Sequence, residues 1–248
     1  MHVDLSGKTA LVTGASGGLG EHFAKVLATS GAEVTLAARR LAALKENVEE
    51  ITGAGGKAKA AELDVTDEAS VANVFAEGPF DIVVNNAGVT LTHAAIEVEP
   101  GEWDKVVDTN LKGAFLVAQA AAKAMRQAER GGSIVNIASI LGLRVAGGVM
   151  PYSVSKAGMI QMTKSMALEW ARYGIRVNAL CPGYIETPLN ADFFATDAGK
   201  ALIKRIPQRR LGRNTDLDGA LLLLSSDAGA YMTGSELVVD GGHLVSSL

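Results

Sequence analysis

Short apolar runs alternate along the chain with longer stretches in which apolar residues recur at helical spacing. The short runs have the length of buried β-strands, and the longer stretches have that of amphipathic helices. This alternation predicts an α/β fold: a doubly wound parallel sheet of about seven strands with helices on both faces. Strands are expected at residues 8–13, 33–38, 58–63, 80–84, 133–139, 176–181 and 236–240. Helices are expected at residues 21–30, 41–51, 103–128, 152–172 and 217–225, with one more starting near residue 66.

A glycine-rich turn, residues 14–20, joins the first predicted strand to the first predicted helix. Glycines allow the backbone to approach a pyrophosphate closely, and the free N–H groups at a helix N-terminus attract its negative charge. The turn has no Gly-Lys-Ser/Thr ending, which disfavours a phosphoryl-transfer P-loop. A strand, a glycine turn and a helix in this order therefore predict a dinucleotide site.

The end of the second predicted strand indicates which dinucleotide binds. Sites that prefer NAD usually carry an acid there, which binds the ribose 2′-hydroxyl. This chain has Ala38, followed by Arg39 and Arg40. Guanidinium groups without a nearby acid suit a 2′-phosphate, so NADP(H) is predicted over NAD(H). The alternative is that both arginines are simply solvated at a helix start.

Polar residues follow three other predicted strands, where ligands bind in open α/β sheets. Asp64 either accepts a hydrogen bond from an adenine amino group or caps the helix that starts near residue 66. Small residues after the fourth strand, in Asn85-Asn86-Ala87-Gly88, again permit close approach to a ligand. Ser139, at the end of the fifth strand, is placed to bind a substrate oxygen. As an isolated serine it is also compatible with an ordinary turn.

Tyr152 and Lys156 are four residues apart at the start of a predicted helix, so their side chains share one face. A free tyrosine has a pKa of about 10 and seldom accepts a proton at neutral pH. An ammonium group at about 4 Å supplies roughly 4 kcal/mol at an effective dielectric of about 20, enough to lower that pKa by about three units. The pair therefore predicts a general acid/base, Tyr152, whose pKa Lys156 depresses.

Two further regions bear on the site. Asn110 is polar within an apolar helical stretch, which indicates either a functional role or an amide that is satisfied inside the helix. Residues 184–210 have no clean period and are expected to form a mobile lid over the site, or an ordinary surface excursion. The candidate pocket residues are mostly apolar and favour a medium-sized hydrophobic ketone, with two polar members: Leu141, Leu143, Val145, Val149, Met150, Leu189, Phe193 and Phe194, with His93 and Arg144.

Composition narrows the functional classes. The 248 residues are 48% hydrophobic and contain no evident linker, so one domain over residues 1–248 is expected. A net charge of −4 gives no basic field for nucleic acid or for an anionic membrane surface. We expect a cytoplasmic protein because the chain shows neither a signal-peptide pattern nor a long apolar run. The single cysteine, Cys181, leaves no internal disulfide, and four scattered histidines indicate no metal site.

Taken together, these motifs resemble the short-chain dehydrogenase/reductase family over essentially the full chain. The family's fold is a Rossmann-like sheet of seven strands, and its reaction moves a hydride between the nicotinamide C4 atom and a carbonyl or alcohol carbon. The motifs that carry the resemblance are Thr13-Gly14-x-x-x-Gly18-x-Gly20, Asp64, Asn85-Asn86-Ala87-Gly88, Asn110, Ser139, Tyr152-x-x-x-Lys156, Pro182-Gly183 and Asp240-Gly241-Gly242.

The resemblance implies a role for each candidate residue. Tyr152 would be the acid/base and Ser139 would hold the substrate oxygen. Lys156 would bind the nicotinamide ribose and depress the Tyr152 pKa, and Asn110 would help to hold a water that relays protons to Lys156. The implied cofactor-binding set is Gly14, Ser16, Gly18, Leu19, Gly20, Arg39, Arg40, Asp64, Val65, Asn86, Ala87, Gly88, Tyr152, Lys156, Pro182, Gly183, Ile185 and Thr187.

Within the family, the chain looks most like 3-oxoacyl-thioester reductases and related ketone or polyol dehydrogenases. Reductases that use acyl carrier protein tend to have an arginine immediately before the glycine that precedes the sixth strand, where this chain has Tyr173. Homotetramers formed through the two long helices are the family's usual assembly. Alternatives to a carbonyl reductase are a polyol or sugar dehydrogenase, an NADPH-sensing binding module, and a sugar-nucleotide epimerase or dehydratase.

Overall fold

The computed structural model describes residues 3–186 and 191–246 and contains one seven-stranded parallel sheet. The strand order is β3-β2-β1-β4-β5-β6-β7, and every neighbouring pair is parallel. This confirms the predicted doubly wound α/β sheet. The strands are β1 (Thr9–Thr13), β2 (Glu33–Ala38), β3 (Lys57–Glu62), β4 (Ile82–Asn85), β5 (Gly132–Ile137), β6 (Ile175–Pro182) and β7 (Glu236–Val239).

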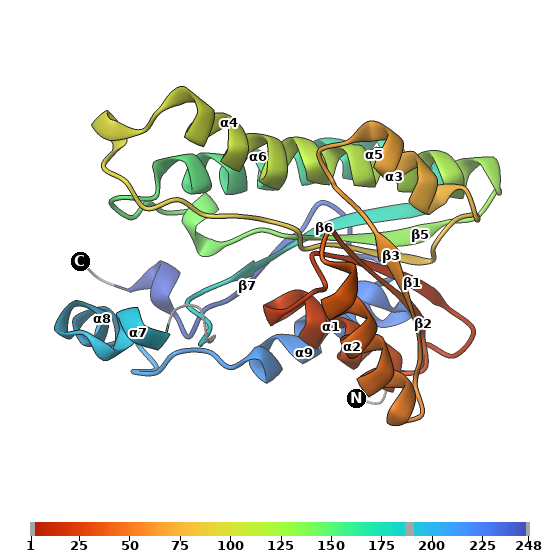
Figure 1. Ribbon diagram of the computed structural model, residues 1–248, viewed down its shortest axis with the longest axis horizontal. Coiled ribbons are helices and arrows are strands. Elements are labelled where there is room, and N and C mark those ends of the chain that lie inside the picture. Colours follow the sequence, from red (N-terminus) through yellow and green to blue (C-terminus); the bar gives the residue numbers. More distant parts are fainter. Residues whose placement is uncertain (1–2, 187–190, 247–248) are drawn as a thin grey trace.

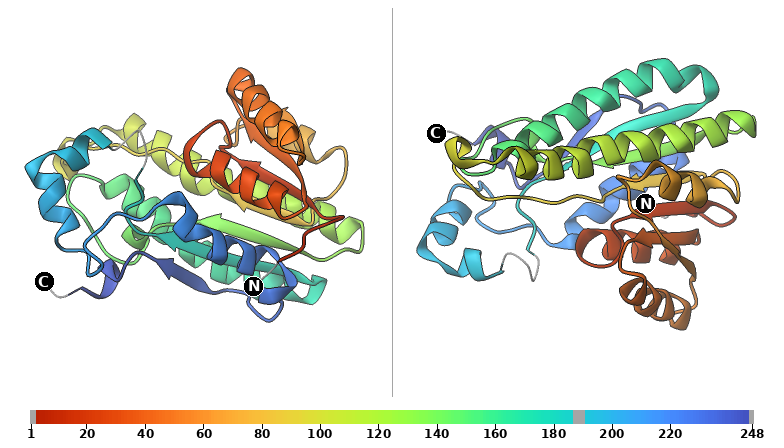
Figure 2. Two further views of the ribbon diagram at one scale, coloured as in Figure 1. Left: turned by 90° about the horizontal axis from the view of Figure 1, so that it is seen from below. Right: turned by 45° about the horizontal axis from the view of Figure 1, so that its top comes forward.

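Helices cover both faces of the sheet, and α3 to α6 lie on the face opposite α1, α2 and α9 (Figures 1 and 2). Short 3₁₀ turns at residues 95–97, 140–142, 171–173, 214–217, 227–229 and 243–245 complete the chain. The helices are α1 (Gly18–Thr29), α2 (Leu41–Gly53), α3 (Glu68–Phe75), α4 (Pro100–Val107), α5 (Gly113–Gln127), α6 (Met150–Trp170), α7 (Ala191–Ala195), α8 (Asp197–Ile203) and α9 (Asp218–Ser225).

Alternating residues of β1 enter different hydrophobic cores on the two sides of the sheet. Val12 packs with Leu27 of α1 on one side of the sheet, whereas its neighbour Leu11 packs with Val117 of α5 on the other. Successive residues of a strand point to opposite faces, and both faces are covered by helices, so the central strands β1, β4, β5 and β6 are mostly apolar and buried along their length, whereas the edge strand β3 is not. The predicted runs and the observed strands agree for this reason.

The long helix predicted at residues 103–128 is in fact three segments. A π-helical segment, Asp108–Lys112, separates α4 from α5. Helix α4 also begins earlier than predicted, because Pro100 occupies its first turn and Glu99 and Glu102 form a capping box. Apolar periodicity alone does not show either the cap or the change of helical pitch.

The region expected to be a lid, residues 184–210, contains α7 and α8, which lie together at one end of the molecule (Figures 1 and 2). Both helices are shorter than the window over which helical periodicity becomes visible, and so the sequence showed no period there. No helix among the described residues is long and apolar enough to span a membrane. Whether this region moves remains a prediction.

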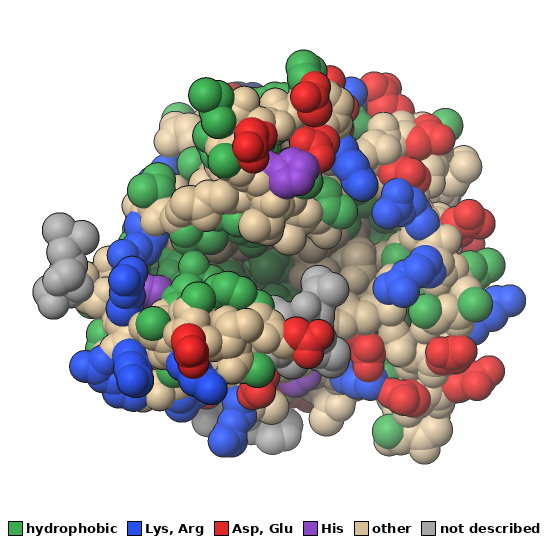
Figure 3. Space-filling model, turned by 60° about the vertical axis from the view of Figure 1, so that its left-hand side comes forward, with side chains coloured by type: hydrophobic (Ala, Val, Ile, Leu, Met, Phe, Trp, Pro, Cys, Tyr) green, Lys and Arg blue, Asp and Glu red, His purple; other side chains and the backbone are tan. Residues whose placement is uncertain are grey.

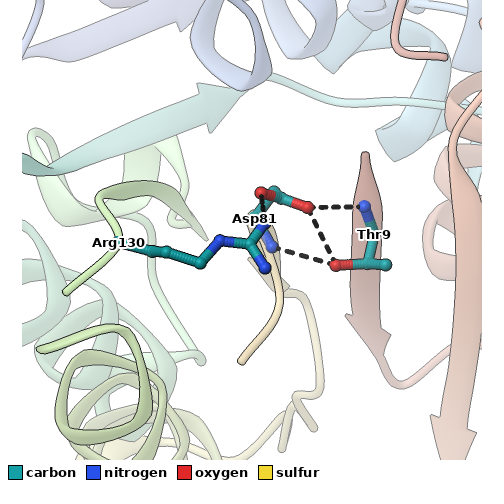
Figure 4. A network of polar contacts seen from close by, with 3 residues as sticks. All are labelled: Thr9, Asp81 and Arg130. Atoms are coloured by element: carbon teal, nitrogen blue, oxygen red, sulfur yellow. Dashed lines mark hydrogen bonds and ion pairs between the residues drawn. The ribbon is translucent and has the colours of Figure 1, made fainter. Parts of the chain in front are cut away.

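At the amino ends of the strands, one carboxylate ties three segments together (Figure 4). Asp81, just before β4, accepts hydrogen bonds from the Thr9 N–H group and hydroxyl at 2.8 and 3.0 Å, and it pairs with Arg130. Burial opposes ionisation, but these donors outweigh it and hold the pKa of Asp81 below its usual value. The network fixes β1 and β4 side by side at the end opposite the glycine turn.

Candidate active site

The glycine turn and the ends of β4, β5 and β6 meet at one edge of the sheet. Helices after β1 and after β4 lie on opposite faces, so the pair β1 and β4 forms the topological switch point at which open α/β sheets bind ligands. Figure 3 shows a hollow on the side of the molecule that carries α7 and α8. Hydrophobic side chains line the hollow, and Lys and Arg side chains gather along part of its rim.

The glycines of the turn serve different purposes. A Cβ atom at Gly20 would lie 2.5 Å from the Asn86 side-chain nitrogen, and one at Gly14 would lie 2.8 Å from the Ala87 Cα atom. Both glycines are therefore required by packing within the protein itself. Gly18 has a φ of +60° and nothing within 4 Å of a Cβ position, so it leaves open space at the start of α1, next to Leu19.

Thr13 and Asn86 join the turn to the end of β4. The Thr13 hydroxyl accepts hydrogen bonds from the Asn86 and Ala87 N–H groups, both at 3.0 Å. The Asn86 side chain donates to the carbonyl groups of Thr13 at 3.0 Å and of Gly14 at 3.4 Å. The Asn86 amide nitrogen is thus committed to shaping the glycine turn, a role that the sequence did not predict.

The end of β2 carries cationic side chains. Arg40 donates from Nη2 to the Ser16 hydroxyl at 3.0 Å, which brings its guanidinium group to the glycine turn. Arg39 is exposed and lies close enough to Asp64 for its charge to favour the ionised form of that carboxyl group and so to help lower its pKa. Ala38, the last residue of the strand, brings no carboxylate to this point. These groups fit a cofactor with a phosphate on its adenosine ribose.

Asp64 is not the helix cap that one sequence interpretation proposed. The cap of α3 is Asp67, whose carboxylate accepts from the Ala69 N–H group at 2.8 Å. Asp64 instead accepts from the N–H and hydroxyl groups of Thr66 at 2.9 and 2.7 Å, and these bonds lower its pKa. The cap interpretation is wrong because the helix begins one turn later than Asp64 would require.

Val65 and Gly88 lie against the helices behind the site. A Cβ at Gly113 would lie 2.7 Å from the Val65 side chain, so Val65 packs tightly on the start of α5. A Cβ at Gly88 would meet Asn110 Oδ1 at 3.2 Å and Lys156 Nζ at 3.7 Å. Gly88 therefore brings the segment after β4 next to two of the predicted catalytic residues.

Asn110 lies in the π-helical segment and is fully buried. Its Oδ1 accepts from the Val89 N–H group at 2.7 Å, and its Nδ2 donates to the Val89 carbonyl at 2.9 Å and to Ser155 Oγ at 3.0 Å. The Ser155 hydroxyl donates to the Tyr152 carbonyl at 2.7 Å. The Asn110 amide is satisfied, and it links the loop after β4 to the first turn of α6. π-Helical segments are frequent at functional sites.

Tyr152, Ser139 and Lys156 converge as the sequence predicted. Ser139 is buried at the end of β5, and its hydroxyl interacts with the Tyr152 hydroxyl and accepts from the Leu141 N–H group at 3.1 Å. Lys156 Nζ lies 5.5 Å from the centroid of the Tyr152 ring and donates to the Ile137 carbonyl at 2.7 Å. The four-residue spacing thus places both side chains at the same strand end.

The protonation behaviour differs from the prediction. Burial raises the pKa of Tyr152, and its interaction with Ser139 opposes this only in part. The expected depression by Lys156 is wrong, because its ammonium group lies near the Tyr152 ring and donates its hydrogen bond to the Ile137 carbonyl. Lys156 itself is only 4% exposed, and burial lowers its pKa to about 8.

The segment after β6 contains the remaining predicted cofactor residues. Pro182 is the last residue of β6, and a Cβ at Gly183 would lie 2.6 Å from the Asp240 side chain, so Gly183 permits close packing on the end of β7. Ile185 is buried and forms a bridge with Gly212. Thr187 and the pocket candidate Leu189 lie outside the described residues.

The pocket differs in part from its predicted lining. Val145 is 85% exposed and Phe193 is 48% exposed, while His93 pairs with Glu102 at 3.1 Å on the surface. Phe194 is buried and its ring lies 5.9 Å from that of Tyr184. The sequence analysis missed Tyr184 and His243, whose rings are 5.4 Å apart. Their positions directly after two glycine-containing strand ends were the available signal.

This fold and site define a nicotinamide-dependent oxidoreductase acting on CH–OH groups. A family model described as enoyl-(acyl carrier protein) reductase matches residues 14–243. The chain belongs to the short-chain dehydrogenase/reductase family.

Individual relatives act on different substrates. The chain is 40% identical to gluconate 5-dehydrogenase of Gluconobacter oxydans, over 98% of this chain and 96% of that protein. It is 37% identical to 3-oxoacyl-(acyl-carrier-protein) reductase FabG of Escherichia coli, over 97% and 98%. A gluconate 5-dehydrogenase from Burkholderia cenocepacia, solved in complex with NADP and tartrate, superposes with a TM-score of 0.94 at 35% identity, covering 99% of this chain and 98% of that one.

Proposed function

We propose that this protein transfers a hydride between NADP(H) and a carbonyl or secondary alcohol carbon, with Tyr152 as the acid/base. The observation that carries the proposal is the convergence of Ser139, Tyr152 and buried Lys156 at the carboxyl edge of the sheet. The nicotinamide, when bound, supplies or accepts the hydride at its C4 atom. The protein must then supply or accept the proton.

Each residue has a role that follows from its surroundings. The Tyr152 hydroxyl, whose pKa is raised by burial, is protonated at neutral pH and suited to donate a proton to the oxygen of a ketone that is being reduced. Ser139 is placed to donate a hydrogen bond to that oxygen. Lys156, with a pKa of about 8, holds and releases a proton near neutral pH and would also bind the nicotinamide ribose.

Asn110 is proposed to support proton exchange with Lys156. Both donors of the Asn110 side chain are already used by Val89 and Ser155, so we propose that its main chain holds the relay water. The side chain then serves to position the first turn of α6, which carries Tyr152. This division of roles keeps the predicted relay and adds a structural function for the amide.

The proposed preference for NADP(H) rests on Arg39, Arg40 and Ser16 around the end of β2, where Ala38 provides no acid. Three solved relatives are described with bound NADP, which supports the proposal. The remaining predicted members of the site, from Gly14 to Gly88 and from Pro182 to Thr187, are proposed to surround the same cofactor. The open space at Gly18, at the start of α1, is consistent with that role.

A paired substitution tests the cofactor preference. Ala38→Asp with Arg39→Leu places an acid beside the ribose and removes a cation, and we expect the ratio of kcat/KM for NADPH to that for NADH to fall by roughly 100-fold. Ala38→Asn with Arg39→Leu is the matched control, since it adds the same volume without the charge. An unchanged ratio in the aspartate variant would refute the assignment.

For the substrate we propose a class of compound and compare three classes. A 3-oxoacyl thioester on a carrier protein is the substrate class that this chain supports least, because Tyr173 stands where reductases of that class tend to have an arginine. The guanidinium groups of Arg126 and Arg172 lie 5.1 and 5.0 Å from the centroid of the Tyr173 ring. A medium-sized ketone and a polyol or sugar acid are the other classes. A measurement of NADPH absorbance loss against oxoacyl thioesters, cyclic diketones and keto sugars ranks them.

A binding module that senses NADPH without turnover is the competing class of function. Such a module needs the glycine turn but no acid/base, so the intact set of Asn110, Ser139, Tyr152 and Lys156 weighs against it. It would bind NADPH and show no turnover with ketones, nor with alcohols and NADP. Location in the cytoplasm, one catalytic domain and a homotetramer complete the proposal.

A further inference from the structure

Arg144 lies on the loop between β5 and α6 and is bound to the last segment of the chain. Its Nη1 donates hydrogen bonds to the His243 carbonyl and, at 3.5 Å, to the Ser246 hydroxyl. The side chain is half-buried as a result. These contacts fix the guanidinium group, so it is held in one place before any ligand arrives.

The Arg144 guanidinium group is linked to the surroundings of Tyr152 through His243 and Tyr184. It lies near both groups, because its positive charge opposes the rise that burial causes in the pKa of Tyr184 and adds to the fall that burial causes in the pKa of His243. The Tyr184 hydroxyl in turn lies close enough to Tyr152 to raise the Tyr152 pKa. The rings of Tyr184 and His243 are 5.4 Å apart. Arg144 is therefore separated from the proposed acid/base by one aromatic side chain.

Within the described part of the chain, no carboxylate forms an ion pair with Arg144. The nearby carboxylate of Asp240 accepts hydrogen bonds from the Gly242 and Leu244 N–H groups at 2.8 and 2.5 Å and caps that turn. The Nε and Nη2 atoms of Arg144, which form one edge of the guanidinium fork, have no hydrogen bond to the described residues. A half-buried cation without a counter-charge costs desolvation free energy. Such unpaired cations are typical of sites that bind an anion.

Two further observations support an anionic ligand with hydroxyl groups. His243 is 6% exposed, and its Nδ1 atom is buried without a hydrogen-bond partner among the described residues. Lys204, Arg205 and Arg209 are exposed on the segment after α8, and basic side chains gather on part of the rim of the hollow (Figure 3). In a chain with a net charge of −4, such a local basic rim attracts anions to one entrance.

We propose that Arg144 anchors a substrate carboxylate and that the substrate is a hydroxy or oxo acid of the sugar-acid class. The carboxylate binds the free Nε and Nη2 edge, and the reacting carbon lies at Tyr152, on the other side of Tyr184. Planar guanidinium and carboxylate groups match in this bidentate geometry. This inference rests on the proposed function and names its substrate class.

The experiment compares two substrates that differ in charge alone. D-Gluconate and D-gluconamide have the same carbon chain, and each is assayed with NADP and the wild-type protein, Arg144→Met and Arg144→Lys. We expect Arg144→Met to raise the KM for gluconate by about 10- to 100-fold. Its kinetics with gluconamide should stay within about twofold of wild type, and Arg144→Lys should recover part of the loss. Arg126→Met, at the opposite end of the sheet, is the control.

Equal losses for the acid and the amide would overturn the proposal, because Arg144 would then act only by holding the last segment of the chain. A loss confined to 3-oxoacyl thioesters would overturn it as well, in favour of a carrier-bound substrate. If wild type turns over neither gluconate nor its amide, the shift in melting temperature of the NADP complex with gluconate or tartrate decides. A shift that Arg144→Met abolishes and that D-sorbitol does not produce supports the carboxylate site, and its absence overturns it.

If the proposed hydride-transfer function itself is wrong, the results differ from those that would refute the role of Arg144. In that case wild type and Tyr152→Phe would both be inactive with every ketone and alcohol. The tartrate and gluconate shifts would still report on Arg144 independently, because they require binding and no turnover.

Discussion

At the scale of single residues, the site places a lysine where its charge is disfavoured. Lys156 is 4% exposed, burial lowers its pKa to about 8, and its one described hydrogen bond is to the Ile137 carbonyl. A lysine buried only for structural reasons would usually be replaced by an apolar residue without loss of stability. A buried lysine that costs stability therefore indicates that Lys156 has a functional role.

The cost can be measured as a function of pH. The folded-state pKa of about 8 lies below the ordinary value of 10.5, so the unfolded state binds more protons between these values and stability rises with pH there. Against Lys156→Met, which cannot titrate, wild type should gain about 2 kcal/mol in unfolding free energy between pH 7 and pH 9.5. Denaturant unfolding of both proteins across this range gives the difference.

Lys164→Met provides the control for that titration, since Lys164 is an exposed lysine on the same helix. Wild type and Lys164→Met should keep a constant difference over the same range. A constant difference between wild type and Lys156→Met would contradict the buried, destabilised ammonium group described here.

The sequence was informative about residue identity and less so about residue environment. Spacing on a helix is local, so the pairing of Tyr152 with Lys156 was predictable. The direction of the Tyr152 pKa depends on burial and on where the ammonium group points, which are set by β5 and the loop after it. For the same reason Tyr184 and His243 were missed: their partners are distant in the chain and meet only in the folded protein.

At the scale of elements, the glycine turn is a rigid unit whose glycines are not equivalent. Gly20 is required because a side chain there would run into Asn86 and the Gly14 carbonyl, whereas Gly18 borders open space. The turn pattern predicted a nucleotide site, but it did not distinguish packing glycines from one that leaves room for a ligand. The distinction depends on Asn86, which follows β4 and packs against Gly20 only in the folded protein.

Two alanine substitutions separate these roles. Gly20→Ala should lower the unfolding free energy by about 3 kcal/mol or more, because the backbone at Gly14 and the Asn86 side chain must shift to admit the new methyl group. Gly18→Ala should cost about 1 kcal/mol, from its φ of +60° alone, and yet weaken NADPH binding. Thermal or denaturant unfolding and NADPH fluorescence titration provide the two readouts. Similar stability losses in both variants would contradict the distinction.

The helices illustrate where element prediction fails. The apolar pattern placed a helix through residues 103–128, and the chain is helical through most of that range. The π-helical segment around Asn110 is a change of pitch that satisfies one buried amide through Val89 and Ser155, and neither partner is near it in sequence. Periodicity reports which face is apolar and does not report how the turns are wound.

At the scale of the whole molecule, α5 and α6 present apolar side chains on the outer surface. Phe115 of α5 and Val154 of α6 are 38% and 44% exposed, and Leu168, further along α6, is 84% exposed. These are the two long helices through which the resemblance to the family predicts a tetramer, and we propose that the small side chains between the exposed residues allow close packing there. The predicted homotetramer therefore has a defined candidate interface.

Light scattering at micromolar concentration tests the assembly. We expect a mass of four chains for wild type and a smaller mass for Leu168→Glu, which puts charge in the candidate interface. Ile96→Glu alters a 95% exposed residue outside these helices and should leave the mass unchanged. A monomeric wild type would refute the tetramer, and an unchanged mass for Leu168→Glu would show that the interface lies elsewhere.

The central claim is that one hydroxyl group, that of Tyr152, supplies the proton in a hydride-transfer reaction. The direct measurement is NADPH consumption by wild type and Tyr152→Phe with the best ketone of the panel, together with NADPH affinity for each protein. We expect turnover to fall by about 10²- to 10⁴-fold while NADPH affinity stays within a few-fold. Comparable turnover in the two proteins would contradict the account.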